Sequence, residues 1–170
     1  GETTVVDRAK GALGRVAAAV ARFARPRAAD AATTKPNIIT RAQWGANEKL
    51  RYEKQDTKRD LIYPHKYETV KHAIIHHSVT PNNYYDPAAM MRSIYYFHAI
   101  TRGWGDIAYN YLIDFMGNVY EGRVGGETAI GCHAEGYNAG SCGICLMGRF
   151  FDNDYTPEMH NAVVWISSWA

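Results

Sequence analysis

The sequence predicts an α/β domain, because strand-like and helix-like segments alternate along most of its length. An apolar run at residues 70–77, rich in β-branched side chains, is typical of a strand. Asp86-Pro87 then supplies a helix N-cap followed by a proline at the first helical position. Further on, strand-like residues 109–115 and 119–121 are separated by Met116-Gly117-Asn118, the spacing of a hairpin.

Residues 1–35 are expected to form a basic helical extension and linker, ahead of a main domain at 36–170. Apolar residues recur at helical spacing in the first part of this segment, and arginines recur every seven residues. Such a helix either makes a weak contact with an anionic envelope surface or is a spacer. The stretch at 25–35 is rich in Ala, Pro and Thr and is typical of a linker.

Composition and charge narrow the class of protein. The net charge of +2 gives no case for a nucleic-acid partner. No apolar run approaches the roughly 18 residues that cross a bilayer, so no transmembrane segment is expected. The chain opens at Gly1 without the basic and apolar regions of a signal peptide, which is therefore absent from this sequence or already removed.

The main domain begins near Pro36 with a short extended piece, followed by a turn of helix that Thr40 caps. Residues 47–68 are charged and irregular. The helix that starts after Asp86 is expected to cover 87–102 and to end at Gly103.

Beyond the hairpin, residues 124–140 are expected to form a glycine-rich loop region and residues 143–148 a central strand. A last helix starts at Thr156-Pro157-Glu158 and is still in progress at Ala170, without a stop signal. We therefore expect the main domain to be incomplete at its C-terminal end.

Two adjacent histidines, His76 and His77, end the strand at 70–77, which we expect to be buried. Neighbouring side chains of a strand point to opposite faces of the sheet, so the two imidazoles are not expected to share one site. One of them is expected to face a metal or a substrate. In the alternative interpretation both are solvated or satisfied at a strand end.

Three cysteines, Cys132, Cys142 and Cys145, lie within one short stretch. With His133 they form a candidate Cys₃His zinc set, although an offset of three residues places Cys142 and Cys145 on opposite faces of a strand. Cys145 is expected in the core. A Cys132–Cys142 disulfide in an exported chain and a cysteine nucleophile are the remaining alternatives.

Tyr109 is expected to start a strand at a loop exit, where its phenol is able to hydrogen-bond a water or an oxyanion. The loop at 131–138 is rich in polar and aromatic groups and suits a rim that contacts a ligand. In the alternative interpretations Tyr109 is a core tyrosine and the loop only wraps the sheet.

Four segments, taken in order, give the chain a resemblance to a known family. They are ITRAQWGA at 39–46, IIHHS at 74–78, GWGDIAYNYLI at 103–113 with VYEGR at 119–123, and HAEGYN at 133–138 leading to GICLMG at 143–148. With these motifs the chain resembles the peptidoglycan recognition protein family, the zinc-dependent N-acetylmuramoyl-L-alanine amidases of type 2.

The resemblance implies a mixed central β-sheet flanked by helices, with a groove on one face. It implies hydrolysis of the amide between the lactyl group of N-acetylmuramic acid and L-alanine in peptidoglycan, with Zn²⁺ as cofactor, muropeptides as partners and a secreted or cell-envelope location. By position, His76 is then a zinc ligand and Tyr109 a catalytic residue that assists the metal-bound water or the transition state. The implied substrate contacts are His133, Tyr137 and Asn138, and with them His77, His98 and Arg123.

In the family pattern two further zinc ligands follow the last helix, a His and then a Cys eight positions later. No histidine of this chain has a cysteine at that spacing, so the sequence supplies one of three expected ligands. Three hypotheses follow. The chain is part of a working amidase, or a peptidoglycan-binding module without metal and hydrolysis, or a general interaction domain whose working part is the basic N-terminal helix.

Overall fold

The computed structural model describes residues 35–55 and 60–170, so the extension predicted at 1–35 lies outside the described residues except for Lys35. A five-stranded sheet forms its centre, in the order β1-β4-β3-β5-β2. The strands are β1 (Ile38–Ile39), β2 (His72–His77), β3 (Tyr111–Ile113), β4 (Val119–Glu121) and β5 (Ser141–Leu146). β3 and β4 pair antiparallel and the other neighbours pair parallel, which confirms the mixed sheet.

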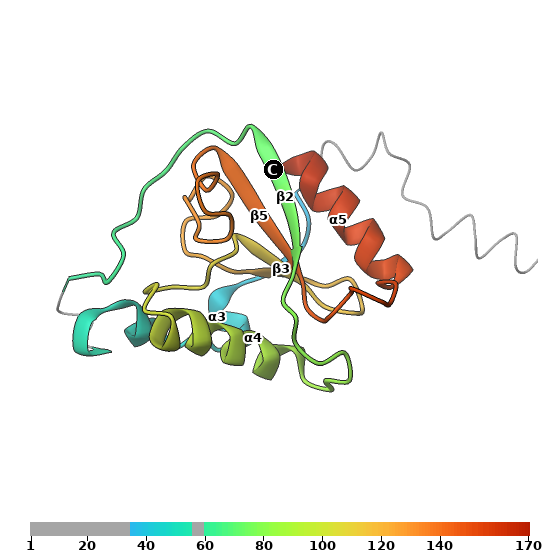
Figure 1. Cartoon of the computed structure of the whole chain (residues 1–170), viewed down its shortest axis with the longest axis horizontal. Coiled ribbons are helices and arrows are strands. Elements are labelled where there is room, and N and C mark those ends of the chain that lie inside the picture. The colour runs from blue at the N-terminus through green and yellow to red at the C-terminus, as the bar shows by residue number, and fades with distance from the viewer. Residues whose placement is uncertain (1–34, 56–59) are drawn as a thin grey trace, which may run out of the picture.

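Helices cover both faces of this sheet (Figure 1). α3 (Arg41–Trp44) and α4 (Pro87–Tyr96) lie on one side, and α5 (Pro157–Trp169) lies on the other. Thr40 and Asp86 cap α3 and α4 as predicted, each accepting a backbone N–H three residues on. No helix in the described part of the chain is long and apolar enough to cross a membrane.

The helix predicted at 87–102 is confirmed in extent but changes its hydrogen-bonding pattern near its end. α4 passes directly into a short π-helix, Phe97–Thr101. π-Helical turns are frequent at functional sites, because the wider turn redirects the side chains that follow. His98 lies within this turn.

Two apolar clusters hold the helices against the sheet. On one face Met91, Ile94 and Tyr95 of α4 pack with Leu112, Cys145 and Met147. On the other face Met159, Ala162 and Ile166 of α5 pack with Tyr111, Ile113 and Ile144. Cys142 belongs to the second cluster, which confirms that Cys142 and Cys145 point to opposite faces of β5.

The prediction that the strand before His76-His77 is buried is wrong. β2 lies at an edge of the sheet, pairs only with β5, and leaves Ile75 45% exposed. A short apolar run is found in edge strands as well as central ones, so the sequence pattern does not distinguish the two. The strand expected to be central is confirmed, since all six residues of β5 are buried.

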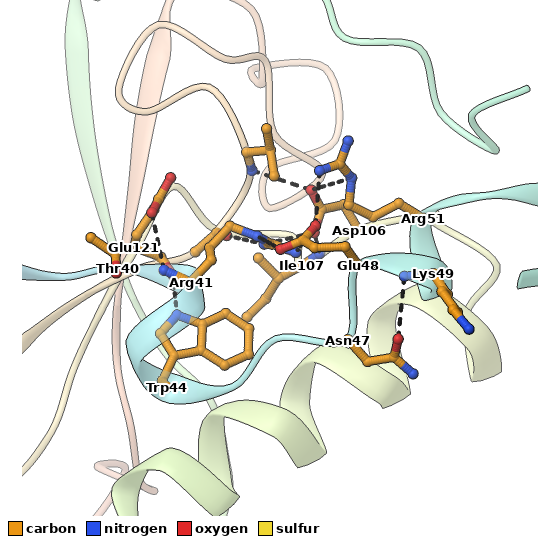
Figure 2. Close-up of polar contacts among 12 residues, drawn as sticks. Thr40, Arg41, Trp44, Asn47, Glu48, Lys49, Arg51, Asp106, Ile107 and Glu121 are labelled. Atoms are coloured by element: carbon orange, nitrogen blue, oxygen red, sulfur yellow. Dashed lines mark hydrogen bonds and ion pairs between the residues drawn. The ribbon is translucent and has the colours of Figure 1, made fainter. Parts of the chain in front are cut away.

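A buried polar network joins α3 to the loop that leads into β3 (Figure 2). Arg41 Nη1 donates to Asp106 Oδ1 at 3.0 Å and to the carbonyl of Gly122, while Arg41 Nε donates to Glu48 Oε1 at 2.8 Å. Asp106 Oδ1 also accepts the backbone N–H of Ile107 at 2.7 Å. Burial alone would lower the pKa of Arg41, but the charge of Asp106 and the hydrogen bond to Glu48 outweigh it and raise that pKa. The network therefore fixes the start of this loop.

Candidate functional site

Two residues of the predicted site, His76 and Tyr109, meet on the face of the sheet that α4 covers. His76 is the register partner of Cys145, whose side chain packs with α4, so the imidazole points to that side. The ring centroids of His76 and Tyr109 are 5.4 Å apart. Tyr109 lies two residues before β3 and does not start a strand as predicted. Its carbonyl accepts the backbone N–H of Arg123 at 2.8 Å.

His98 and His133 complete a cluster of rings around Tyr109. The centroid of His98 is 5.5 Å from that of Tyr109, and the centroid of His133 is 6.4 Å from it. His133 also reaches His76, with His76 Nε2 and His133 Nδ1 only 3.0 Å apart. Four predicted site residues from β2, the π-helical turn and two loops are thus brought together.

A pocket of about 400 Å³ opens beside this cluster, between the loop after β2 and α4. Its lining mixes polar and apolar side chains: Ser78, Val79, Thr80, Ser93, Ile94, Phe97, His98 and Tyr109. The loop after β2 leaves the carboxyl end of a strand, which is where open α/β sheets usually bind ligands.

Sequence reasoning missed Val79 and Phe97 as pocket residues. The position of Val79, two residues after the histidine pair, could have indicated that it lies near the site. Its left-handed backbone, with φ at 57°, gives no signal in the sequence, because valine rarely adopts it. Phe97 lies next to His98 in the π-helical turn, and both residues line the pocket.

Burial controls protonation in the cluster. Burial, with a smaller contribution from the charge of Arg123, lowers the pKa of His98 to about 4. Burial is also the main reason that the pKa of His133 falls to about 4 and that the pKa of His76 is lowered. It raises the pKa of Tyr109, so that near neutral pH the three imidazoles are uncharged and the phenol is protonated.

The remaining predicted contacts lie at different places. His77 is on the α5 face, where its Nδ1 accepts the N–H of Phe150 at 2.9 Å, so it is not brought to the pocket. Asn138 Oδ1 accepts the backbone N–H of His133 at 2.8 Å and fixes the loop that carries this ring. Tyr137 is 75% exposed on the same loop.

Arg123 is a buried cation, only 2% exposed. Its Nη2 lies 3.4 Å from Cys132 Sγ, and its guanidinium stacks over the ring of Tyr63. Its Nε has no hydrogen-bond partner, and no carboxylate of the described residues forms an ion pair with it. The described residues therefore compensate the positive charge of Arg123 only in part.

The donor set does not fit a three-ligand zinc centre. Among residues 35–55 and 60–170, no group of three or more His, Cys, Asp or Glu side chains is placed to hold a metal. Cys132, Cys142 and Cys145 are free thiols, so neither the candidate Cys₃His set nor the Cys132–Cys142 disulfide forms. Of the predicted ligands only His76 is present, and its Nε2 contacts His133.

Comparison with known proteins gives the same family by sequence and by structure. Residues 66–170 match the family model described as N-acetylmuramoyl-L-alanine amidase. The chain is 36% identical over 126 residues to peptidoglycan-recognition protein LE of Drosophila melanogaster, covering 73% of this chain and 33% of that protein. It is 33% identical over 129 residues to peptidoglycan-recognition protein SC2 of the same species, and this match covers 74% of this chain and 62% of that protein.

A solved structure has the same fold. Peptidoglycan recognition protein LE in complex with tracheal cytotoxin, a monomeric diaminopimelic acid-type peptidoglycan, superposes with a TM-score of 0.60 at 34% identity. The match covers 74% of this chain and 68% of that one. The chain spans less than two thirds of the length of both curated relatives.

Proposed function

The chain belongs to the peptidoglycan recognition protein and type 2 N-acetylmuramoyl-L-alanine amidase family, and from that premise we propose that its pocket binds muropeptides of peptidoglycan, and that the whole protein hydrolyses their N-acetylmuramoyl-L-alanine amide. The observation that carries the proposal is the cluster formed by the rings of His76, Tyr109 and His98, of which Tyr109 and His98 line the pocket. A substrate in the cell wall also agrees with a secreted or cell-envelope location.

His98 is suited to donate a hydrogen bond to a carbonyl of the substrate. Its Nδ1 accepts the backbone N–H of Ala108 at 3.2 Å, so in the neutral ring the proton is on Nε2. Because its pKa is lowered to about 4, the imidazole stays neutral at physiological pH and keeps this fixed tautomer. The ring lines the pocket and offers one oriented N–H.

Tyr109 supplies a second donor. Its raised pKa keeps the phenol protonated, and a protonated phenol is able to stabilise the oxyanion that develops when an amide carbonyl is attacked. Removal of one such donor typically lowers the rate of hydrolysis by about 10²–10³-fold.

Arg123 supports the choice of a carboxylate-bearing substrate. Its guanidinium is 2% exposed but lies close enough to His98 to help lower the pKa of that ring, so its positive charge attracts an anion in the neighbouring pocket without a direct contact. The structure of the LE relative contains a diaminopimelic acid-type peptidoglycan fragment, and we propose the same class of muropeptide for this chain. Tyr137, exposed on the loop next to His133, is proposed as a contact at the rim.

Hydrolysis in this family requires zinc, which polarises the amide carbonyl and supplies an activated water when it is bound. His76 is the ligand proposed from this chain. A catalytic zinc has three protein ligands, and the described residues do not supply a set of three. The resemblance places two more after the last helix, so hydrolysis is proposed for the protein that carries them.

A second candidate function is muropeptide binding without hydrolysis. The observation that favours it is the pocket of about 400 Å³ itself, because its donors His98 and Tyr109 are able to contact a ligand without a metal. The two candidates differ in their response to zinc and to chelators.

We would measure binding of a monomeric diaminopimelic acid-type muropeptide by calorimetry, with and without chelator. His98→Ala is expected to weaken binding at least about tenfold by loss of its hydrogen bonds and packing. His160→Ala, at an exposed site on α5, is the matched control and should bind as the wild type does. Unchanged affinity of His98→Ala would refute the pocket assignment.

Release of the free peptide is then assayed with added zinc for the chain extended through its downstream segment. Tyr109→Phe should lower this rate about 10²-fold or more, while Tyr85→Phe, at a fully exposed tyrosine, should not. Binding that survives chelation, together with no cleavage by the extended chain at any zinc concentration, would establish the binding-only function instead.

A further inference from the structure

Cys132 differs from the other two cysteines of the chain in its surroundings. Cys142 and Cys145 are fully buried in the two apolar clusters, whereas Cys132 is partly exposed on the loop before β5. Burial raises the pKa of Cys142 to about 12 and also raises the pKa of Cys145, so both remain protonated thiols. Buried structural cysteines are inert, while reactive cysteines are partly exposed and have positive charge nearby.

A buried guanidinium supplies positive charge beside Cys132. Arg123 is 2% exposed, and its Nη2 donates to Cys132 Sγ at 3.4 Å. Its Nε has no hydrogen-bond partner, so the guanidinium has a further donor beyond this contact. Within residues 35–55 and 60–170 no carboxylate forms an ion pair with Arg123. The sulfur therefore lies against a cation whose charge is still available to it.

Main-chain hydrogen bonds hold the thiol and the guanidinium together. Cys132 N–H donates to the carbonyl of Ala108 at 3.0 Å, and Arg123 N–H donates to the carbonyl of Tyr109 at 2.8 Å. Ala108 and Tyr109 are consecutive residues, so the same piece of chain positions both partners. The guanidinium carbon of Arg123 also lies 5.1 Å from the ring centroid of Tyr63. The contact is thus a property of the folded chain and is lost on unfolding.

From this arrangement we infer that Cys132 is a redox-sensitive modification site, whose thiolate Arg123 stabilises and hydrogen peroxide oxidises to a sulfenic acid. The inference does not depend on the proposed function, because it concerns the chemistry of one thiol. It involves neither a metal ion nor the histidine rings of the candidate site.

The oxidation moves two electrons from sulfur to peroxide. The thiol of Cys132 releases its proton, and the thiolate attacks one oxygen of hydrogen peroxide, so that an S–O bond forms and the O–O bond breaks. The hydroxide that leaves takes up the proton, and thiol and peroxide give sulfenic acid and water. Arg123 favours this reaction, because the thiolate is the nucleophile and receives a charge-assisted hydrogen bond from the guanidinium.

The first test identifies the oxidised residue. The 170-residue chain is treated with hydrogen peroxide at pH 7 in the presence of dimedone, which traps sulfenic acids, and peptide mass spectrometry locates the adduct. We expect an adduct on Cys132 and none on Cys142 or Cys145, which are matched controls within the same chain. An adduct spread evenly over the three cysteines, or absent from Cys132, would overturn the inference.

Unfolding separates the effect of exposure from the effect of the guanidinium. Iodoacetamide, a small neutral reagent, alkylates thiolates, and its rate is compared at pH 6.5 for the folded chain and for the chain in urea. Unfolding should raise the rates at Cys142 and Cys145, because it exposes them. At Cys132 it should lower the rate at least about threefold, because the sulfur loses Arg123. Faster alkylation of Cys132 in urea would refute stabilisation by Arg123.

Variants of Arg123 test the same charge in the folded chain. Arg123→Met should slow alkylation of Cys132 at least about fivefold, and Arg123→Lys, which keeps the charge, should restore part of the rate. Arg149→Met, at an exposed arginine, is the matched control and should react as the wild type does. A folded Arg123→Met, by circular dichroism, that reacts within twofold of the wild type would overturn the inference. If Arg123→Met does not fold, the urea comparison on the wild-type chain decides.

Discussion

Val79 adopts a backbone conformation that costs free energy and places its side chain at the pocket. Its φ of 57° is a genuine outlier for a β-branched residue, with a cost of about 1–3 kcal/mol. The loop compensates, since Val79 N–H donates to the carbonyl of Gly148 at 2.8 Å and Ser78 Oγ accepts the N–H of Gly148 at 2.9 Å. The side chain remains 53% exposed in the pocket wall.

Val79→Gly is therefore expected to affect stability and binding in opposite directions. Relief of strain, less the entropy cost of glycine, should raise the free energy of unfolding by up to about 1 kcal/mol. Muropeptide affinity should fall, because the pocket loses an apolar wall. Chemical denaturation and calorimetry measure the two effects. Val164→Gly, at a 40% exposed valine within α5, is the control and should only destabilise. Destabilisation by Val79→Gly would show that the strain is absent.

At the scale of elements, the network around Arg41 connects α3 to the loop that precedes β3. Asp106 is 3% exposed and bonds both Arg41 and the backbone of Ile107, so its position sets the path of the chain toward Tyr109. A buried ion pair of this kind positions its elements, and breaking it by removing one partner is costly.

Asp106→Asn should lower the free energy of unfolding by about 3 kcal/mol, because Arg41 remains buried with only Glu48 as a charged partner. Denaturant titration measures this loss. Asp152→Asn is the matched control, since the Arg149–Asp152 pair is exposed and should contribute less than about 1 kcal/mol. Equal losses for the two variants would contradict a structural role of the buried network.

At the scale of the whole molecule, buried neutral histidines make folding stability depend on pH. The pKa of His98 is about 4 in the folded chain against 6.5 for an unperturbed histidine. Above pH 6.5 neither state is charged, so His98 contributes no pH dependence. Between pH 6.5 and 4 the unfolded chain binds a proton that the folded chain does not, and stability falls as pH falls.

This loss from His98 reaches about 3 kcal/mol at pH 4. His98→Asn, which keeps an acceptor for the N–H of Ala108, should flatten the dependence of unfolding free energy on pH in that window. Ser168→Ala, at an exposed residue of α5 that does not titrate, is the control and should leave the slope unchanged. The measurement is denaturant unfolding from pH 7 to pH 4, and equal slopes for the wild type and His98→Asn would contradict the assignment.

Much of the architecture could be predicted from the sequence, because its causes are local. N-cap residues, the hairpin spacing and strand alternation indicated α3, α4, the β3–β4 pair and the opposite orientations of His76 and His77. The family motifs indicated which of the two histidines faces the site. The edge position of β2 was not predictable in this way, since it depends on which strands pair.

The sequence by itself determined most of the helices and strands, the family, and the choice of His76, Tyr109, His98 and His133 as candidate residues. Only the tertiary structure decided that His133 touches His76 and that His77 faces α5 with Phe150. The physical reason is that these contacts join segments far apart in the chain. Whether two imidazoles meet is set by how a loop packs beside Gly143, and no local pattern encodes that approach.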